Sequence, residues 1–358
     1  MKPSTPRAAG FRMPAEWAPH AGCWVAWPAA ADLWGDYLAE TQTAFVGLCD
    51  AIADPDPATG VRRGELPHVL VGDPAAEAAA RAALAAVPVE LHSVPYGDIW
   101  LRDTGPIFLT DAAGALATVR FGFNGWGGKY ILAHDDRVAA RIAELCGVPA
   151  FAFPWILEGG SVEVDGEGTC LTTRQCLLNP NRNPQLSQDP VEAGLREALG
   201  VERILWLDEG LRNDHTDGHI DTIARFVAPG VVVCMEAQGQ DDPNAATLEA
   251  IARDLASFTD ARGRRLEVVR IPSPGDVRDE DDQVIAASYV NFYIGNRCVA
   301  VPVYGRSRDA RAVDAIAACF PGRRTVGIEA RALVAGGGGA LHCITQQMPA
   351  VGAEKGVP

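Results

Sequence analysis

Short runs of β-forming residues recur along this chain, and several come as adjacent pairs ahead of a helical stretch. The predicted strands, each bounded by turn residues, are residues 23–27, 68–71, 89–94, 106–109, 117–123, 203–207, 230–236, 266–271 and 288–294. Ala-rich amphipathic stretches predict helices over residues 38–53, 74–86, 136–146, 189–199, 244–258 and 308–319. This order is closer to repeated units of strands plus one helix than to strict alternation of strand and helix, which argues against a simple nucleotide-binding sheet.

The chain is long enough for two domains, but its pattern favours one. No stretch is Pro/Ser-rich or charge-blocked enough to act as an interdomain linker, and there is no literal repeat, so we expect a single α/β domain over residues 1–358. The glycine run at residues 336–339 lacks the Lys and Ser/Thr pair of a phosphate loop. We predict a tight turn there, leading into an apolar, strand-like segment.

The net charge argues against certain partners, and the cysteine content bears on the location of the protein. Lys and Arg number 31 against 46 Asp and Glu, and the net charge of -15 repels phosphate backbones and anionic lipids, so we expect neither nucleic acid nor a membrane as partner. No apolar run has the length of a bilayer span or of a signal-peptide core. The nine cysteines are irregularly spaced and form no CxxC pair, which favours a reducing, cytoplasmic location.

The densest cluster of ionisable groups lies at residues 214–221 and runs into the apolar segment 222–227. If the cluster is extended, its period of two places four side chains on one face: His215, Asp217, His219 and Asp221. A solvated loop is the plain alternative, but such groups beside a core strand are costly unless they are used. Two uses remain open: a divalent metal such as zinc, or a planar organic cation held by carboxylates while a histidine moves protons.

Three further polar residues stand among apolar ones. Asp103 precedes a predicted strand, Glu158 lies between apolar residues and a Gly pair, and Cys343 follows the glycine run beside polar residues, unlike the other cysteines. Taken alone, Asp103 also fits an ion pair with Arg102, and Glu158 fits a turn acid. Together with a histidine and without a cofactor loop, these residues fit nucleophilic attack on a cationic carbon. Guanidinium matches because carboxylates pair bidentately with its planar fork.

Several longer segments carry a resemblance to a known family. They are residues 13–17, 24–28, 100–106, 123–128 (FNGWGG), 157–161, 171–184 (LTTRQCLLNPNRNP), 218–221, 288–293 and 337–347. In these segments the chain resembles the agmatine deiminases, a family of the guanidine-modifying superfamily that also includes arginine deiminases and amidinotransferases and is related to bacterial-type peptidylarginine deiminases. The resemblance spans nearly the whole chain.

The resemblance implies a fold and a set of roles. The fold is a five-bladed, pseudo-symmetric α/β propeller of the pentein type, built from ββαβ-like repeats, which suits the strand pairs described above. No metal or organic cofactor is implied, the partner is a small cationic guanidine, and a homo-oligomer stays open. The implied roles are Cys343 as nucleophile, His219 as general acid/base, Asp103, Glu158 and Asp221 as guanidinium carboxylates, and Trp100, Asp217 and Gly338 as substrate contacts.

The implied activity is hydrolysis of agmatine to N-carbamoylputrescine and ammonia through a thiouronium on Cys343, a reaction of polyamine biosynthesis. The alternatives are a deiminase of free or peptidyl arginine, a metal-binding hydrolase using residues 214–221, and a non-catalytic polyamine-binding protein. We expect agmatine to be preferred over arginine, since only Arg102 stands near the site and Asp103 would neutralise it. The chain departs from the family pattern in one segment: where the family often reads Glu-Thr-Asn-Gly-His, residues 215–219 read His-Thr-Asp-Gly-His. This difference bears on the contacts to the far, amine-bearing end of the substrate.

Overall fold

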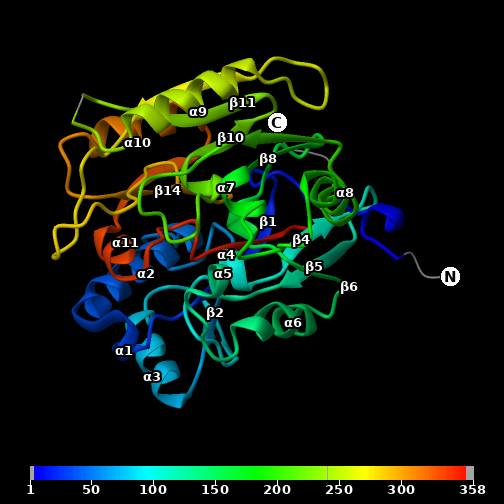
Figure 1. Cartoon of the computed structure of the whole chain (residues 1–358). Helices are drawn as coiled ribbons and strands as arrows, with labels where there is room; N and C mark the ends of the chain where they lie inside the picture. Colours follow the sequence, from blue (N-terminus) through cyan, green and yellow to red (C-terminus); the bar gives the residue numbers. More distant parts are fainter. Residues whose placement is uncertain (1–3, 240, 352–358) are drawn as a thin grey trace.

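The computed structural model describes residues 4–239 and 241–351, and its strands form five sheets (Figure 1). Four sheets have three strands each and one order of connections: an antiparallel pair, then a crossover helix, then a third strand parallel to the second. These sheets are β4 (Ile107–Thr110), β5 (Leu116–Gly122) and β6 (Ala150–Ile156); β7 (Glu163–Val164), β8 (Thr169–Thr173) and β9 (Arg203–Leu207); β10 (Ala224–Ala228), β11 (Val231–Glu236) and β12 (Glu267–Pro272); and β13 (Tyr293–Ile294), β14 (Cys298–Val303) and β15 (Arg324–Glu329).

The fifth sheet joins the two ends of the chain. Strand β16 (Gln346–Pro349) pairs antiparallel with β1 (His20–Ala26), which runs parallel to β2 (Leu66–Val71), and an added strand β3 (Glu90–Ser93) extends the sheet parallel to β2. The first three of these strands repeat the ββαβ order of the other sheets, with the first strand supplied from the opposite end of the chain. The fold is therefore a five-bladed α/β propeller.

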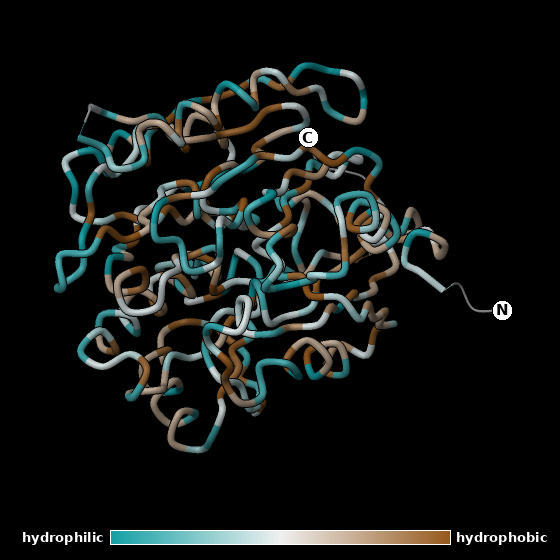
Figure 2. The backbone as a smooth tube through the Cα atoms, viewed as in Figure 1, coloured by the Kyte–Doolittle hydropathy of each residue, from teal (hydrophilic) through white to brown (hydrophobic). Residues whose placement is uncertain are grey.

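Long helices such as α3 (Pro74–Ala83), α6 (Asp135–Cys146), α8 (Gln188–Leu199) and α9 (Ala245–Ser257) lie on the outside of the propeller, and the short helices α4 (Leu101–Thr104), α5 (Gly125–Gly128) and α7 (Arg174–Leu177) lie nearer its centre (Figure 1). The other long helices are α2 (Leu38–Ala53) and α10 (Asp309–Cys319), and the other short ones are α1 (Ala31–Trp34) and α11 (Arg331–Gly337). Strands such as β2 and β11 are coloured hydrophobic in Figure 2, whereas much of the outer chain is hydrophilic. None of the helices in the described part of the chain has the length and apolar character of a membrane span.

Local chemistry sets the helix ends. At the start of α3 the Asp73 carboxylate accepts hydrogen bonds from the backbone N–H groups of Ala75 and Ala76, and Pro74 occupies the first turn, where no N–H is needed. Helix α8 ends at Gly200, whose φ of 68° is the left-handed conformation that glycine accepts without strain.

The predicted elements are confirmed in large part, but two segments were misassigned and several strands were not predicted. The predicted strand 288–294 is extended only at Tyr293 and Ile294, because the residues before them form an irregular buried segment. The glycine run is also not a separate turn before a strand: Gly337 is the last residue of α11, Gly338 caps that helix, and residues 341–344 form turns. Strands that the prediction lacked include β6 and β14, each interrupted by a proline.

Candidate active site

A cavity of about 150 Å³ opens among the short central elements. Its lining is formed by Leu33, Asp98, Trp100, Asp103, Trp126, Tyr130, Leu132, His215, Thr216, Gly336, Gly337, Gly338, Gly339 and Cys343. Aromatic side chains make up its walls and two carboxylates its acidic groups. No lysine or arginine occurs among these lining residues, so the cavity favours a flat cation over an anion.

Cys343 lies in the turns between α11 and β16 and is only 4% exposed. The Asn291 side chain donates a hydrogen bond from Nδ2 to its Sγ over 3.2 Å, and Asp221 Oδ2 lies 3.7 Å from the same sulfur. Burial and the negative charges of Asp221 and Asp103 raise the pKa of the Cys343 thiol well above its ordinary value. The raised pKa favours the neutral thiol in the isolated site.

His219 is fully buried, and neither ring nitrogen has a hydrogen-bond partner within the described chain. Its Nδ1 lies 3.8 Å from Asp103 Oδ1, and its Nε2 lies 3.8 Å from Glu158 Oε2. Burial alone would lower the pKa of His219, but these two carboxylates raise it well above its ordinary value. The ring is thus a protonated acid with both N–H groups uncommitted.

Asp103 and Glu158 are held in place by hydrogen bonds from neighbouring residues. Asp103 Oδ2 accepts a hydrogen bond from Trp126 Nε1 over 2.8 Å, and its Oδ1 accepts one from the Gly160 backbone over 2.9 Å. Glu158 accepts a hydrogen bond from Arg182 Nε over 3.1 Å. Burial raises the pKa of Asp103, whereas for Glu158 the pKa is lowered because His219 and Arg182 outweigh the effect of burial.

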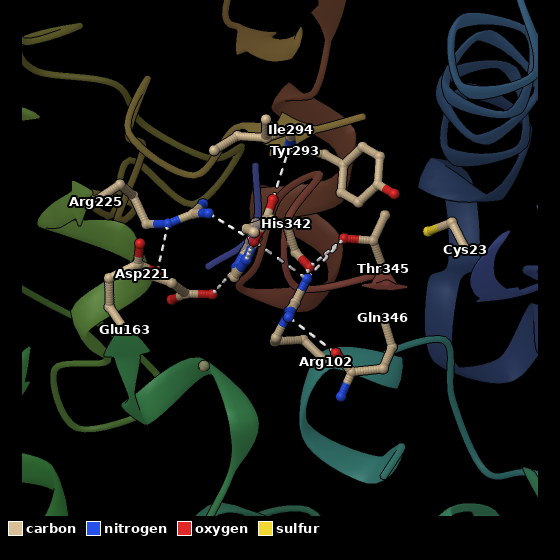
Figure 3. A network of polar contacts seen from close by, with 12 residues as sticks. Cys23, Arg102, Glu163, Asp221, Arg225, Tyr293, Ile294, His342, Thr345 and Gln346 are labelled. Carbon is tan, nitrogen blue, oxygen red and sulfur yellow. Dashed lines mark hydrogen bonds and ion pairs between the residues drawn. The ribbon is translucent and has the colours of Figure 1, made fainter. Parts of the chain in front are cut away.

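Asp221 is anchored by a buried chain of ionisable side chains (Figure 3). Its Oδ2 accepts a hydrogen bond from His342 Nδ1 over 2.7 Å, and His342 Nε2 donates to Glu16 over 2.8 Å. Glu16 in turn accepts a hydrogen bond from Arg225 over 2.7 Å. Burial acts to raise the pKa of Asp221, but the His342 hydrogen bond together with the nearby His342, His219 and Arg225 outweighs it, so the pKa of this carboxylate is lowered. Its other oxygen, Oδ1, has no partner within the described chain and is free to accept a substrate N–H group.

The segment 214–221 is not extended, so the predicted common face is wrong. Residues 215–218 form turns, and a short 3-10 helix, η4, spans Ile220–Thr222. The chain buries His219 and Asp221 and leaves His215 at the cavity lining. Asp217 lies beside the cavity rather than on its lining, where it binds Lys129 over 2.6 Å and also Arg182.

The expected neutralisation of Arg102 by Asp103 is also wrong. The Arg102 guanidinium points to the C-terminal segment, where it donates hydrogen bonds to Gln346 Oε1 over 2.9 Å and to Thr345 Oγ1 over 3.4 Å (Figure 3). It thereby ties α4 to the start of β16. Asp103 stays available to His219 and to the cavity because adjacent residues of a helical turn point in different directions.

Metal ligation by residues 214–221 finds no support in the described residues. The two groups with metal-binding spacing are Glu158, Cys176 and His219, and, away from the cavity, His68, Glu90 and His92. Only His219 of these comes from the acidic cluster. The turn conformation is the physical reason, since it sends His215 and Asp217 away from His219 and Asp221.

Three residues that position the site were not singled out from sequence. Asn291 contacts Cys343 from the segment mistaken for a strand, Arg182 anchors Glu158, and Glu16 completes the chain of ionisable side chains behind Asp221. Arg182 carried a usable signal, as the single cation of an Asn/Pro-rich run that also bore the family resemblance. Glu16 also lies in a segment that carries the resemblance, residues 13–17, but its hydrogen-bond partners Arg225 and His342 lie more than 200 residues away in sequence.

The five-bladed propeller and its buried cysteine, histidine and carboxylates define a class of α/β protein equipped for nucleophilic catalysis on a cationic group. The family model of Porphyromonas-type peptidyl-arginine deiminases matches residues 12–349. The chain belongs to this family.

Its similarity to named relatives extends over nearly the full length. The agmatine deiminase of Ectopseudomonas mendocina is 40% identical over 97% of this chain and 98% of its own length, and that of Stutzerimonas stutzeri is 41% identical with the same coverage. Among solved structures, the agmatine deiminase of Enterococcus faecalis is 34% identical, covers 98% of both chains and has a TM-score of 0.88. A variant of the C. jejuni agmatine deiminase with substrate bound is 25% identical, with a TM-score of 0.84 over 95% of this chain and 97% of that one.

Proposed function

We propose that this protein hydrolyses agmatine to N-carbamoylputrescine and ammonia. The observation that carries the proposal is the convergence of Cys343, His219 and three carboxylates around one aromatic-walled cavity without a lining cation. The named relatives, agmatine deiminases at about 40% identity over almost the whole chain, support the same reaction. The protein is accordingly a hydrolase of the C–N bonds of linear amidines.

The first half of the reaction forms a covalent intermediate. The guanidinium pairs with Asp221, whose Oδ1 is free, and with the carboxylates beside His219. The arriving positive charge offsets the field of Asp221 and Asp103, so the Cys343 thiol ionises and its sulfur attacks the guanidinium carbon. His219 gives a proton to one nitrogen, the C–N bond breaks, and ammonia leaves a thiouronium on Cys343.

The second half hydrolyses that intermediate. His219, now neutral, removes a proton from water as the oxygen attacks the thiouronium carbon. The C–S bond then breaks, the sulfur leaves as thiolate, and the hydroxyl group on the carbon gives up its proton to the released ammonia or to solvent, which leaves a neutral urea. The same histidine therefore serves first as acid and then as base, and its position between Asp103 and Glu158 stabilises the protonated form at both stages.

The substrate's primary ammonium pairs with Asp98 in this account. Asp98 is the one lining carboxylate besides Asp103, and burial raises its pKa. Its two oxygens accept hydrogen bonds from Trp34 Nε1 over 3.0 Å and Trp100 Nε1 over 2.7 Å, which leaves further lone pairs for an ammonium. His215 and Tyr130 also line the cavity, with Tyr130 Oη 3.2 Å from His215 Nδ1.

Product analysis tests the proposal directly. Purified protein mixed with agmatine should release ammonia and a ureido product in equal amounts, and a chelator should not reduce the rate. The Cys343→Ala variant should release neither while still binding agmatine, since the carboxylates remain. A folded wild-type protein that produces no ureido compound refutes the proposal, and an active Cys343→Ala variant refutes covalent catalysis.

Three further proposals concern the number of domains, the partner and the location of the protein. We propose that residues 1–358 are one domain, supported by the pairing of β16 with β1 across the two chain ends. We also propose that the partner is a small guanidine cation rather than nucleic acid or membrane, in keeping with the net charge of -15. All nine cysteines are free thiols, which supports a cytoplasmic location.

A further inference from the structure

Two histidines and a glutamate meet on the sheet of β1, β2 and β3, away from the cavity that holds Cys343. His68 lies on β2, and Glu90 and His92 lie on β3, the edge strand of that sheet. The register pairs His68 with Glu90 and Leu70 with His92, so the alternation of the strands places all three side chains on one face. None of them lines the catalytic cavity.

The donor atoms of these residues point toward a common place. His68 Nδ1 and His92 Nε2 are 3.0 Å apart, Glu90 Oε2 is 3.7 Å from His68 Nδ1, and Glu90 Oε1 is 3.8 Å from His92 Nε2. A tetrahedral ion with ligands at about 2.0 to 2.2 Å holds neighbouring donor atoms about 3.3 to 3.5 Å apart. Movements of a few tenths of an ångström would therefore bring the three donors to a common ion.

The surroundings hold the two imidazoles in their metal-binding form. Trp24 packs against both rings, with centroid distances of 4.6 Å to His68 and 4.8 Å to His92. Gly22 leaves the space for the His68 ring, because a Cβ at that position would come within 2.6 Å of it. Burial lowers the pKa of His68 to about 4 and also lowers the pKa of His92, so both rings are neutral near pH 7.

We propose that His68, Glu90 and His92 form a binding site for a divalent transition-metal ion of the Zn²⁺ type. Two imidazoles and one carboxylate suit Zn²⁺, Co²⁺ and Ni²⁺ better than Mg²⁺ or Ca²⁺, which prefer oxygen ligands. The ion takes the place of the proton shared by the two imidazole nitrogens, and that proton moves to the other nitrogen of its own ring, so both ligands remain neutral imidazoles. Because the Glu90 side chain is 56% exposed, water completes the coordination. The ion clamps the edge strand β3 to β2 and takes no part in the reaction at Cys343.

A titration of tag-free protein with Co²⁺ and Zn²⁺ tests the site. The titration is done in the Cys343→Ala background, so that the catalytic thiol cannot compete for the ion. We expect one equivalent of Co²⁺ to bind and to give the visible absorption bands of Co²⁺ with nitrogen and oxygen ligands. Binding at the other group, Glu158, Cys176 and His219, would instead add the near-ultraviolet absorption of a cobalt–thiolate bond. Zn²⁺ should displace it and raise the melting temperature.

Matched variants decide which residues bind the ion. His92→Gln should abolish stoichiometric binding. Glu90→Gln should weaken binding at least about tenfold, because loss of even an outer partner of a metal ligand costs that much. The Glu90 side chain is exposed, so the fold should tolerate this change. His134→Gln removes an exposed histidine elsewhere and should bind like the parent. Absence of one-equivalent binding, or binding of parent strength in either His92→Gln or Glu90→Gln, overturns the proposal. A thiolate spectrum that survives both changes assigns the ion to Cys176 and overturns it as well.

Discussion

His219 is the residue whose removal reports most clearly on the order of steps. If some attack by Cys343 survives without the acid, the thiouronium forms but no base activates water to remove it. The His219→Ala variant should therefore accumulate an adduct on Cys343, visible by intact-protein mass spectrometry after mixing with agmatine, while turnover falls by at least about a hundredfold.

The doubly substituted variant lacking Cys343 is the control for that experiment and should show no adduct. His342 cannot take over the role, because both of its ring nitrogens are committed to Asp221 and Glu16. Normal turnover by His219→Ala would reassign the acid/base to another group, with His215 the remaining histidine on the cavity lining.

Asp98 is the residue that separates recognition of the tail from recognition of the guanidinium. Asp98→Asn removes the charge and keeps one acceptor oxygen, so only one of the hydrogen bonds from Trp34 and Trp100 survives. A hydrogen bond to a charged group contributes about 1.5 to 3 kcal/mol, so kcat/KM for agmatine should fall about tenfold or more. Kinetics with butylguanidine, which keeps the four-carbon chain but lacks the amine, provides the comparison. An equal loss for both compounds would mean that Asp98 acts only by orienting the tryptophans.

Among the elements, the end of α11 shapes the cavity through its capping glycine. Gly338 has a φ of 84°, and a Cβ there would lie 2.5 Å from His215 Nδ1. Gly338→Ala should lower kcat/KM for agmatine between about 10- and 100-fold, because a small displacement at this wall disturbs substrate alignment. Steady-state kinetics and a melting curve for each variant measure the effect.

Gly128→Ala is the matched control, since Gly128 has the same φ of 84° but no atom near the added methyl group. Both variants carry the same backbone strain, so their melting temperatures should fall similarly. Equal activity in the two variants would show that the end of α11 does not shape the substrate site.

Elements with regularly spaced apolar residues could be predicted from the sequence. Fully buried segments could not, because nearly all of their residues are apolar and no spacing stands out. Helices α2 and α10 and strands β1 and β11 were predicted within a few residues because their apolar spacing is regular. The segment before β13 looks like a strand, since its residues are as apolar as a buried strand, yet it is irregular and delivers Asn291 to Cys343. The short elements that carry Asp103 and Asp221 span a turn or less, too short for any period to show.

At the scale of the whole molecule, two features could not be predicted from local sequence patterns: the closure of the propeller by β16 and β1, and the buried chain of side chains behind Asp221. Pairing of β16 with β1 joins residues over 300 positions apart, and the contact between Glu16 and His342 does the same. The propeller and the roles of Cys343 and His219 were instead implied by family resemblance. Asp217 was predicted to share one face of an extended segment with His219 and Asp221. Residues 215–218 form turns instead, so the alternation of side chains does not hold and Asp217 lies beside the cavity rather than on its lining.

The charges of the whole site predict an unusual pH dependence. Cys343 must lose its proton and His219 must keep its own, and the pKa of each is raised. Raising the thiol pKa shifts the rise of activity to higher pH, and raising the histidine pKa delays the loss of its acid form. We expect kcat/KM to keep rising past the ordinary thiol pKa of about 8.5.

In kcat the rise should come at lower pH than in kcat/KM, because bound agmatine offsets the carboxylates around Cys343. Measured rate profiles from about pH 6 to 10 separate the two parameters. A kcat/KM that is already level below about pH 8 would contradict substrate-assisted ionisation of Cys343.

The central claim, that this cavity accepts a guanidine with a cationic tail, is tested most directly by a comparison of kcat/KM for agmatine, free arginine and a peptide ending in arginine. An α-carboxylate entering the cavity meets Asp98 and no lysine or arginine among the lining residues. An unpaired, desolvated charge costs several kcal/mol, and each 1.4 kcal/mol is tenfold in rate. The account predicts that agmatine exceeds both arginine substrates by about a hundredfold or more, whereas equal or better turnover of either arginine substrate would contradict it.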